Sequence, residues 1–242
     1  MELLEPIDDA ELRLPGPAPR AALFDFNGTI SLDEPILDRL FQEVFAQIGV
    51  ELTSDVYYAH LAGLSDPEIV VTGLELHGRA AEPALCAELL RAKIDRYKRV
   101  VLAEPTVPAA VADAVRAVAA RVPIAIGSGA VREEIVHVLD QHALRDLFGV
   151  LVTIDDVTHG KPDPETYLRC LDGLRATHPE LEPADCVVFE DSRFGIAAAH
   201  AAGMRCVAVH TSGDRASLAA AELVVQGLTR ELALAVLGTE GG

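Results

Sequence analysis

Residues 21–29 read AALFDFNGT, an apolar run that ends in a carboxylate and a glycine turn. An uninterrupted apolar run of this length is typical of a strand buried on both faces of a parallel sheet. Asp25 would lie at the end of that strand, where a carboxylate is placed to act as a nucleophile with backbone amides nearby for a phosphate. The stretch therefore predicts a reactive group at one edge of an α/β sheet.

Five more apolar runs of strand length follow along the chain. They lie at residues 122–126, 150–154, 186–190, 205–209 and 222–225. Helical stretches at 131–139, 164–172 and 195–202 separate the later runs, and we expect each to be a right-handed crossover. This alternation predicts a Rossmann-like α/β core with a parallel sheet.

The connection between the first two runs is much longer than one crossover helix needs. About ninety residues separate Phe26 from Val122, with apolar residues at helical spacing over 36–48 and further helical stretches around 69–76 and 85–101. We therefore expect a helical cap at 33–104, inserted into a core of 20–32 and 105–242. Residues 1–19 would form an N-terminal arm, and residues 31–34 and 103–106 the hinges of the cap.

Three other predicted strands also end in polar groups. Ser128 lies in GSGA after the second run, Lys161 lies in HGKPDPETY after the third, and Glu190 and Asp191 close the fourth in FEDSRFG. The carboxyl ends of parallel strands meet at one edge, where α/β proteins build their sites. A hydroxyl and a lysine suit a phosphate, and an adjacent acidic pair suits Mg²⁺.

With these four motifs in order, the sequence resembles the haloacid-dehalogenase-like superfamily, in the branch that includes β-phosphoglucomutase-like phosphatases. The motifs are DFNGT, Ser128, Lys161 in GKPDP, and FEDSRFGIAAAHAAGM at 189–204, which is the most specific. The resemblance covers residues from about 20 to 235. It implies the core fold directly, while the cap matches by position and helical character.

The resemblance implies a mechanism in which Asp25 attacks phosphorus in line and forms an aspartyl-phosphate, which water or a second acceptor discharges. Asp25, Asn27 and Lys161 would be the catalytic residues. Mg²⁺ would be held by Asp25, the backbone carbonyl of Asn27, Glu190 and Asp191. The implied phosphate-binding residues are Gly28, Thr29, Ser128, Gly129 and Lys161.

Asn27 departs from the family pattern, which has a second aspartate at this position as general acid and base. Such proton transfer contributes about 10²–10⁴-fold to the rate. An amide has no proton to exchange at neutral pH, although its backbone carbonyl can still serve the metal. We therefore expect metal binding to survive better than turnover.

Other departures bear on the activity. Leu37 stands where family mutases have a histidine, and Asp66 stands where they have an arginine for the distal phosphate. Ser65 and Asp66 replace the lysine that phosphonoacetaldehyde hydrolysis needs. The pair Glu190–Asp191 argues against haloacid dehalogenation, which uses no magnesium.

The leading hypothesis is a phosphatase of a small phosphorylated metabolite, best on acyl or aryl phosphates, whose leaving groups need little protonation. The alternatives are a catalytically weak phospho-metabolite binding or regulatory protein, and a phosphotransferase or sugar phosphomutase. Arg132 could reach a phosphate from the helix that follows Ser128, and this point stays open. Asp155 and Asp156 are expected to form the loop that leads to Lys161.

The charge balance excludes several partners. Lys plus Arg is 20 and Asp plus Glu is 38, so the formal charge is −18, which repels nucleic acid and anionic lipid. A phosphate site on such a chain needs a local cation.

The four cysteines show no metal-ligand spacing and are interpreted as reduced, which favours the cytoplasm. The acidic N-terminus is unlike a signal peptide, no apolar run reaches membrane-spanning length, and we expect a monomer or homodimer.

Overall fold

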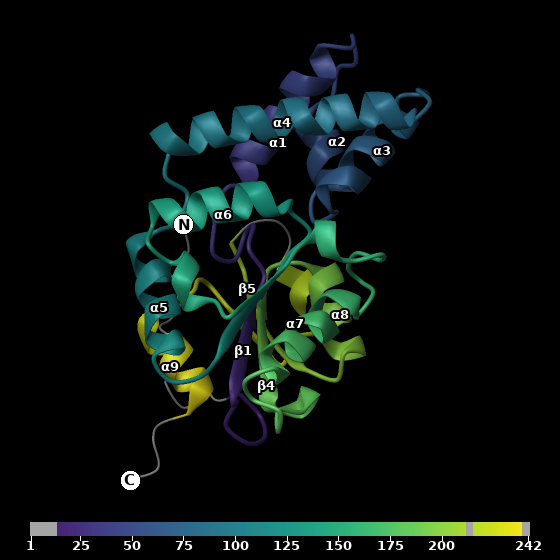
Figure 1. The fold of residues 1–242 in the computed structure, drawn as a ribbon. Coiled ribbons are helices and arrows are strands. Elements are labelled where there is room, and N and C mark those ends of the chain that lie inside the picture. Colours follow the sequence, from purple (N-terminus) through teal and green to yellow (C-terminus); the bar gives the residue numbers. More distant parts are fainter. Residues whose placement is uncertain (1–13, 212–214, 239–242) are drawn as a thin grey trace.

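A computed structural model describes residues 14–211 and 215–238. Its sheet is parallel throughout, in the order β3-β2-β1-β4-β5-β6. The strands are β1 (Ala21–Phe24), β2 (Ile124–Gly127), β3 (Val150–Val152), β4 (Cys186–Glu190), β5 (Arg205–Val209) and β6 (Leu223–Val225). The expected Rossmann-like α/β core is confirmed, and each of the six apolar runs contains a strand (Figure 1).

Two strands differ slightly from their expected bounds. β2 begins at Ile124 because the amide of Val122 still donates to Val118, closing the last turn of the preceding helix. β3 ends at Val152 because Thr153 caps a 3₁₀ turn over Ile154–Asp156. The core of each run is right, and its ends are set by local hydrogen bonds.

Helices cover both faces of the sheet (Figure 1). α5 (Ala109–Ala119), α6 (Arg132–Gln141) and α9 (Arg230–Leu237) share a core with one face, while α7 (Glu165–Arg175) and α8 (Arg193–Ala201) cover the other. Successive side chains of β1 point to opposite faces of the sheet. Phe24 stacks on Phe189 on the side of α5, α6 and α9, and Leu23 packs on the side of α7 and α8. α5 and α9 pack on each other and go beyond the helices expected from the sequence.

The long connection between β1 and β2 is helical. It contains α1 (Glu34–Ala46), α2 (Ser54–Val56), the π-helical turn η1 (Tyr57–Leu61), α3 (Asp66–Leu76) and α4 (Pro83–Ala103). No strand occurs within residues 33–104, all of which the structure describes. These helices lie together at one end of the molecule, next to the core (Figure 1). The arrangement supports the expected cap, and we use that name for residues 33–104.

The two linkers of the cap lie side by side. The hydroxyls of Ser31 and Thr106 are hydrogen-bonded at 2.7 Å, and the amide of Leu32 donates to the carbonyl of Thr106 at 2.8 Å. α1 begins two residues after Leu32 and α4 ends three residues before Thr106. The pairing places both chain crossings at one point, so the expected hinges at 31–34 and 103–106 are adjacent. Their movement stays a prediction.

Part of the N-terminal arm docks on the core. Leu14 is buried, and the Arg205 guanidinium donates to the carbonyls of Pro15 and Pro17 at 2.9 and 2.7 Å. Residues 1–13 of the expected arm lie outside the described residues.

All four cysteines are free, and three of them are buried.

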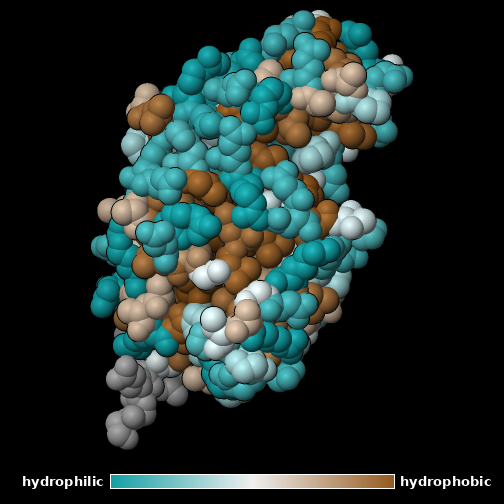
Figure 2. Space-filling view, in the orientation of Figure 1, coloured by the Kyte–Doolittle hydropathy of each residue, from teal (hydrophilic) through white to brown (hydrophobic). Residues whose placement is uncertain are grey.

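The surface agrees with the acidic composition. In the view of Figure 2 most of the cap is hydrophilic, and hydrophobic residues gather in the middle of the face, over the sheet. Of the helices that the structure describes, none combines the length and apolar character needed to cross a membrane.

Candidate active site

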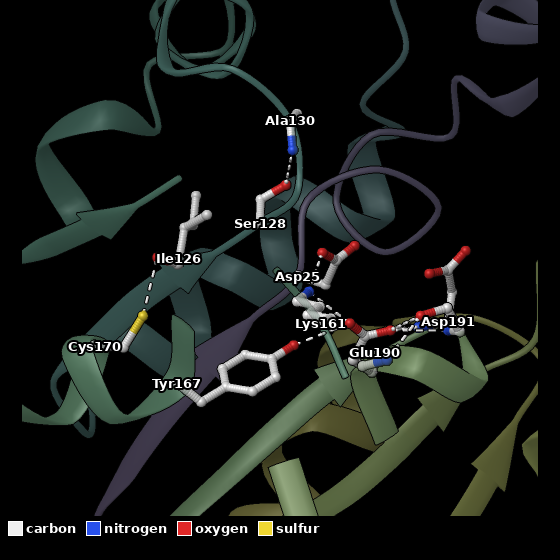
Figure 3. A network of polar contacts seen from close by, with 11 residues as sticks. Asp25, Ile126, Ser128, Ala130, Lys161, Tyr167, Cys170, Glu190 and Asp191 are labelled. Carbon is white, nitrogen blue, oxygen red and sulfur yellow. Dashed lines mark hydrogen bonds and ion pairs between the residues drawn. The ribbon is translucent and has the colours of Figure 1, made fainter. Parts of the chain in front are cut away.

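The predicted polar groups converge at the carboxyl edge of the sheet (Figure 3). Asp25 directly follows β1, and Glu190 ends the neighbouring β4. Since Phe24 and Phe189 are partners in the register, Asp25 and Glu190 lie next to each other at the edge of the sheet. Asp191 follows, Ser128 comes after β2, and Lys161 enters from the loop after β3. All five line one cavity of about 310 Å³. Parallel pairing of β1, β2 and β4 is therefore what brings these distant residues together.

Lys161 lies between two carboxylates. Its Nζ donates to Asp25 Oδ1 and to Glu190 Oε1, both at 2.6 Å, and its side chain is buried. Burial disfavours the ammonium form, but Asp25 and Glu190 outweigh it and hold the pKa of Lys161 above its usual value. Lys161 is therefore a fixed positive charge beside Asp25, the predicted nucleophile.

Glu190 is fixed by a complete set of donors. Its Oε1 accepts from Lys161 and from the Tyr167 hydroxyl at 3.0 Å, while its Oε2 accepts from the amides of Asp191 and Ser192 at 2.8 Å. Burial opposes ionisation, yet Lys161 and these donors lower the pKa of Glu190. A Cβ on Gly195 would lie 1.6 Å from Glu190 Oε1, so the start of α8 can approach only with glycine there.

Asp25, Glu190 and Asp191 form a carboxylate cluster. One oxygen of each lies within 4.8 Å of the others. Three carboxylates face one compensating lysine in this group. Burial raises the pKa of Asp25 to about 7 although Lys161 opposes it, and burial together with Glu190 and Asp25 raises the pKa of Asp191 well above its usual value. Hard oxygen ligands with uncompensated negative charge fit Mg²⁺.

The side chain of Asn27 points to a cap linker. Its Nδ2 donates to Asp33 Oδ2 at 2.9 Å, and the same oxygen accepts from Ser31 Oγ at 2.8 Å and from the Tyr97 hydroxyl. Burial raises the pKa of Asp33, and these donors oppose the increase. The amide of Asn27 thus joins the nucleophile loop to the cap. Asp33 was not expected at the site, because no spacing rule relates it to Asn27.

Gly28 and Thr29 require a correction. The amide of Gly28 donates to the carbonyl of Ser31 at 2.7 Å, and that of Thr29 donates to the carbonyl of Phe26 at 3.4 Å. Thr29 is fully buried, and neither residue lines the cavity. Both amides are used inside the turn, so the geometry does not offer them to a phosphate. Gly28 instead has a φ of +76°, and a Cβ there would lie 1.8 Å from Asp191 Oδ2.

Ser128 and Gly129 both line the cavity. Ser128 is 2% exposed and its Oγ accepts from the amide of Ala130 at 3.1 Å, which leaves the hydroxyl able to donate. Gly129 touches the cap: a Cβ there would lie 3.3 Å from Ser65 Cα, and its carbonyl accepts from Asp66 at 3.4 Å. Ser128 suits a phosphate, whereas Gly129 allows the cap to approach.

Arg132 does not reach the cavity. Its guanidinium donates to the carbonyl of Leu151 at 2.9 Å and pairs with Asp156, and its amide donates to Asp155 Oδ2. These contacts do not support a phosphate-binding role for Arg132, which the sequence leaves open. Asp155 and Asp156 lie in the loop before Lys161, as expected, and hold the start of α6 there.

The cap supplies much of the cavity wall that the sequence did not identify. Glu34, Tyr57, Tyr58 and His60 line it from the cap, with Arg193 on the core side. The Arg193 guanidinium lies 4.7 Å from the Phe194 ring centroid. Helical periodicity shows which face of a helix is buried, but it does not distinguish burial against the core from burial at a cavity.

Two cap positions bear on the choice of reaction. Leu37 lines the cavity, and Asp66 is bound on both oxygens by the buried Lys93 at 2.9 Å. Lys93 also donates to Glu134 of α6 at 2.7 Å, which ties the cap to the core. Neither Leu37 nor Asp66 therefore offers a cation for a second phosphate.

The profile of the haloacid dehalogenase-like hydrolase family matches residues 22–209. The chain is 34% identical over 187 residues to "Fructose-1-phosphate phosphatase YqaB" of Escherichia coli, covering 77% of this chain and 94% of that protein. It is 32% identical over 210 residues to "Protein CbbY" of Rhodobacter capsulatus, covering 83% and 90%.

A solved structure has the same fold over most of its length. CbbY of Rhodobacter sphaeroides, a variant in complex with xylulose-(1,5)bisphosphate, superposes with a TM-score of 0.76 at 26% identity, over 87% of this chain and 95% of that one. With the site geometry and the two relatives above, this establishes the resemblance read from the motifs. The chain therefore belongs to the haloacid dehalogenase-like hydrolase family and is a phosphohydrolase.

Proposed function

We propose that this phosphohydrolase is a magnesium-dependent phosphatase of small phosphorylated sugars, with Asp25 as its nucleophile. The observation that carries the proposal is the contact of 2.6 Å between Asp25 and Lys161 inside the carboxylate cluster. A buried carboxylate beside a fixed cation, in a cavity lined by core and cap residues, is an arrangement that suits attack on a phosphate ester.

Each residue of the site has its own role in the proposed hydrolysis. An Asp25 oxygen attacks phosphorus, the bond to the leaving oxygen breaks, and water then releases phosphate from the aspartyl-phosphate. Lys161 balances charge on the nucleophile and the transferring group, and Ser128 donates to a phosphoryl oxygen. Asp25, Glu190, Asp191 and the backbone carbonyl of Asn27 would hold Mg²⁺. When bound, Mg²⁺ would lower the repulsion between the two anions.

The substrate class follows from the cavity and the relatives. A volume of about 310 Å³ fits one small metabolite. Similar proteins are named as phosphatases of fructose-1-phosphate, of validoxylamine A 7'-phosphate and of phosphorylated carbohydrates. These names favour sugar esters over the acyl and aryl phosphates suggested by Asn27 alone. Leu37 and the Lys93-bound Asp66 argue for hydrolysis over a mutase reaction.

Two further attributes belong to the proposal. The free cysteines favour a reducing compartment such as the cytoplasm. The assembly as a monomer or homodimer stays a prediction.

Phosphate release tests the proposal. Sugar phosphates and p-nitrophenyl phosphate are incubated with the wild-type chain, Asp25→Asn and Asp172→Asn, with Mg²⁺ and after its chelation. Asp172 is a matched control on the exposed surface of α7, where it pairs with Arg175. We expect multiple turnovers by wild type and Asp172→Asn with Mg²⁺, and none by Asp25→Asn.

Two results would contradict the proposal. Turnover that persists in Asp25→Asn would exclude the nucleophile. Substrate binding without turnover by the wild-type chain would favour the binding or regulatory alternative.

A further inference from the structure

Glu34 is a cavity residue that the reaction described above does not use. It is the first residue of α1, directly after the cap linker, and it lines the same cavity as Asp25 and Asn27. Its Oε1 is buried and has no hydrogen-bond partner. A buried polar atom without a partner is rare in folded proteins and often marks a functional site. Glu34 therefore lines the cavity with one carboxyl oxygen that no protein group satisfies.

The reaction lacks a proton donor at the position where the family has one. Breaking a sugar phosphate ester leaves an alkoxide, which must take a proton as it departs. Asn27 has no proton to give, and its amide is held by Asp33 at 2.9 Å. Asp33 accepts three hydrogen bonds on Oδ2, and although its Oδ1 has no partner, Asp33 does not line the cavity.

The other carboxyl groups lining the cavity are engaged. Asp25 and Glu190 share Lys161, Asp191 completes their cluster, and Asp66 is paired with Lys93. In the described part of the chain Glu34 forms no ion pair. It is therefore the carboxyl of the cavity wall that is left for proton transfer.

The surroundings of Glu34 favour exchange of a proton near neutral pH. Burial raises the pKa of Glu34 to about 7; a hydrogen bond with Tyr57 opposes the increase, Asp33 and Asp38 add to it, and Lys93 opposes it. Across the cavity, Asp191 also interacts with Glu34, as does the Tyr58 hydroxyl from η1. A carboxyl with a pKa near the working pH can both give and take a proton.

We propose that Glu34 is the general acid and base of this enzyme, in place of the aspartate that Asn27 replaces. The inference rests on the proposed phosphatase reaction. As Asp25 attacks, the bond between phosphorus and the sugar oxygen breaks and the Glu34 carboxyl gives its proton to that oxygen. In the second step water attacks phosphorus, the bond to Asp25 breaks, and the Glu34 carboxylate takes a proton from the water.

The test compares four proteins: wild type, Glu34→Gln, Asn27→Asp and the double variant. Each is assayed with fructose-1-phosphate, whose leaving group needs a proton, and with acetyl phosphate, whose leaving group needs none. Because both substrates form the same aspartyl-phosphate, the rate that distinguishes them is release of the leaving group in the first turnover. Glu34→Gln should slow the release of fructose by about 10²–10⁴-fold and the release of acetate much less, while steady-state phosphate release falls with both substrates. Asn27→Asp should restore most of the loss in the double variant.

Glu43→Gln is the matched control, since Glu43 lies on the exposed side of the same helix and pairs with Arg96, away from the cavity. Rapid release of acetate from acetyl phosphate in the first turnover shows that Glu34→Gln is folded. Equal losses of the first-turnover rate on both substrates, a change in KM alone, or no rescue by Asn27→Asp would overturn the role of Glu34. A wild-type chain that turns over neither substrate would overturn the phosphatase proposal itself.

Discussion

At the scale of single residues, the site consists of buried charges that compensate one another only in part. Lys161 neutralises part of the charge on Asp25 and Glu190, while Asp191 remains in a negative field. Glu34 adds a fourth acid on the cap side of the same cavity. Buried charges without partners destabilise a fold, so this arrangement is consistent with a site kept for binding and catalysis.

The environment of Glu34 makes a prediction about stability that needs no substrate. Its pKa is raised from 4.5 to about 7 by burial. Between these values the folded state binds more protons than the unfolded state, so the stability contributed by the protonated carboxyl is lost as pH rises through this window. Glu34→Gln removes the titration. Wild type should therefore lose thermal stability relative to Glu34→Gln between about pH 5 and about pH 8.

The measurement is the unfolding temperature of both chains against pH, with Glu43→Gln as the control. Parallel curves for wild type and Glu34→Gln would show that Glu34 keeps its ordinary pKa in the folded state.

At the scale of elements, the loop after β1 and the start of α8 are shaped by close approach to the acidic pair. Gly28 faces Asp191 and Gly195 faces Glu190. A side chain at either position would displace a carboxylate of the cluster. The two glycines therefore set the geometry of the cluster from opposite sides without taking part in the chemistry.

Gly28→Ala tests this point. The substitution meets both a positive φ of +76° and a contact of 1.8 Å with Asp191 Oδ2, whereas Gly49→Ala meets a similar φ of +72° with nothing within 4 Å. Gly49→Ala should cost about 1–2 kcal/mol of unfolding free energy from the left-handed conformation alone. Gly28→Ala should cost more and should also weaken Mg²⁺ affinity, measured by calorimetric titration. Equal stability losses and unchanged affinity would contradict the account.

The elements also show what the sequence could predict. Apolar runs and their polar ends sufficed for the sheet and for Asp25, Ser128, Lys161, Glu190 and Asp191, because parallel strands converge at one edge whatever the loops do. The contacts of Asn27 with Asp33 and of Lys93 with Asp66 and Glu134 join different elements, and no local pattern encodes them. The contact of Arg132 with Asp156 also joins two elements, so the sequence alone leaves the role of Arg132 open.

At the scale of the whole molecule, the cap and core enclose the site together. Lys93 of α4 is fully buried and binds Asp66 of the cap and Glu134 of the core at once. The paired linkers at Ser31 and Thr106 lie at the base of the cap. The cavity therefore exists only with the cap in this position, and the reacting groups are removed from water there. Low dielectric strengthens the electrostatic action of Lys161 on the nucleophile.

The overall charge of −18 means that the site needs local positive charge to bind an anion. An anionic substrate is repelled by the molecule as a whole and attracted by local cations in the cavity. Lys161 and Arg193 are such cations in the described cavity wall, and a bound Mg²⁺ would add to them. Charge at the two scales thus has opposite effects on the same ligand.

The most direct test of the central claim is to trap the phosphoryl group on the enzyme. Wild type is mixed with Mg²⁺ and a substrate carrying a radiolabelled phosphoryl group, quenched in acid within the first turnover, and digested for peptide mapping. We predict label on the peptide that contains Asp25, and none in Asp25→Asn. Phosphate release by the wild-type chain with no label on that peptide at any quench time would contradict the account.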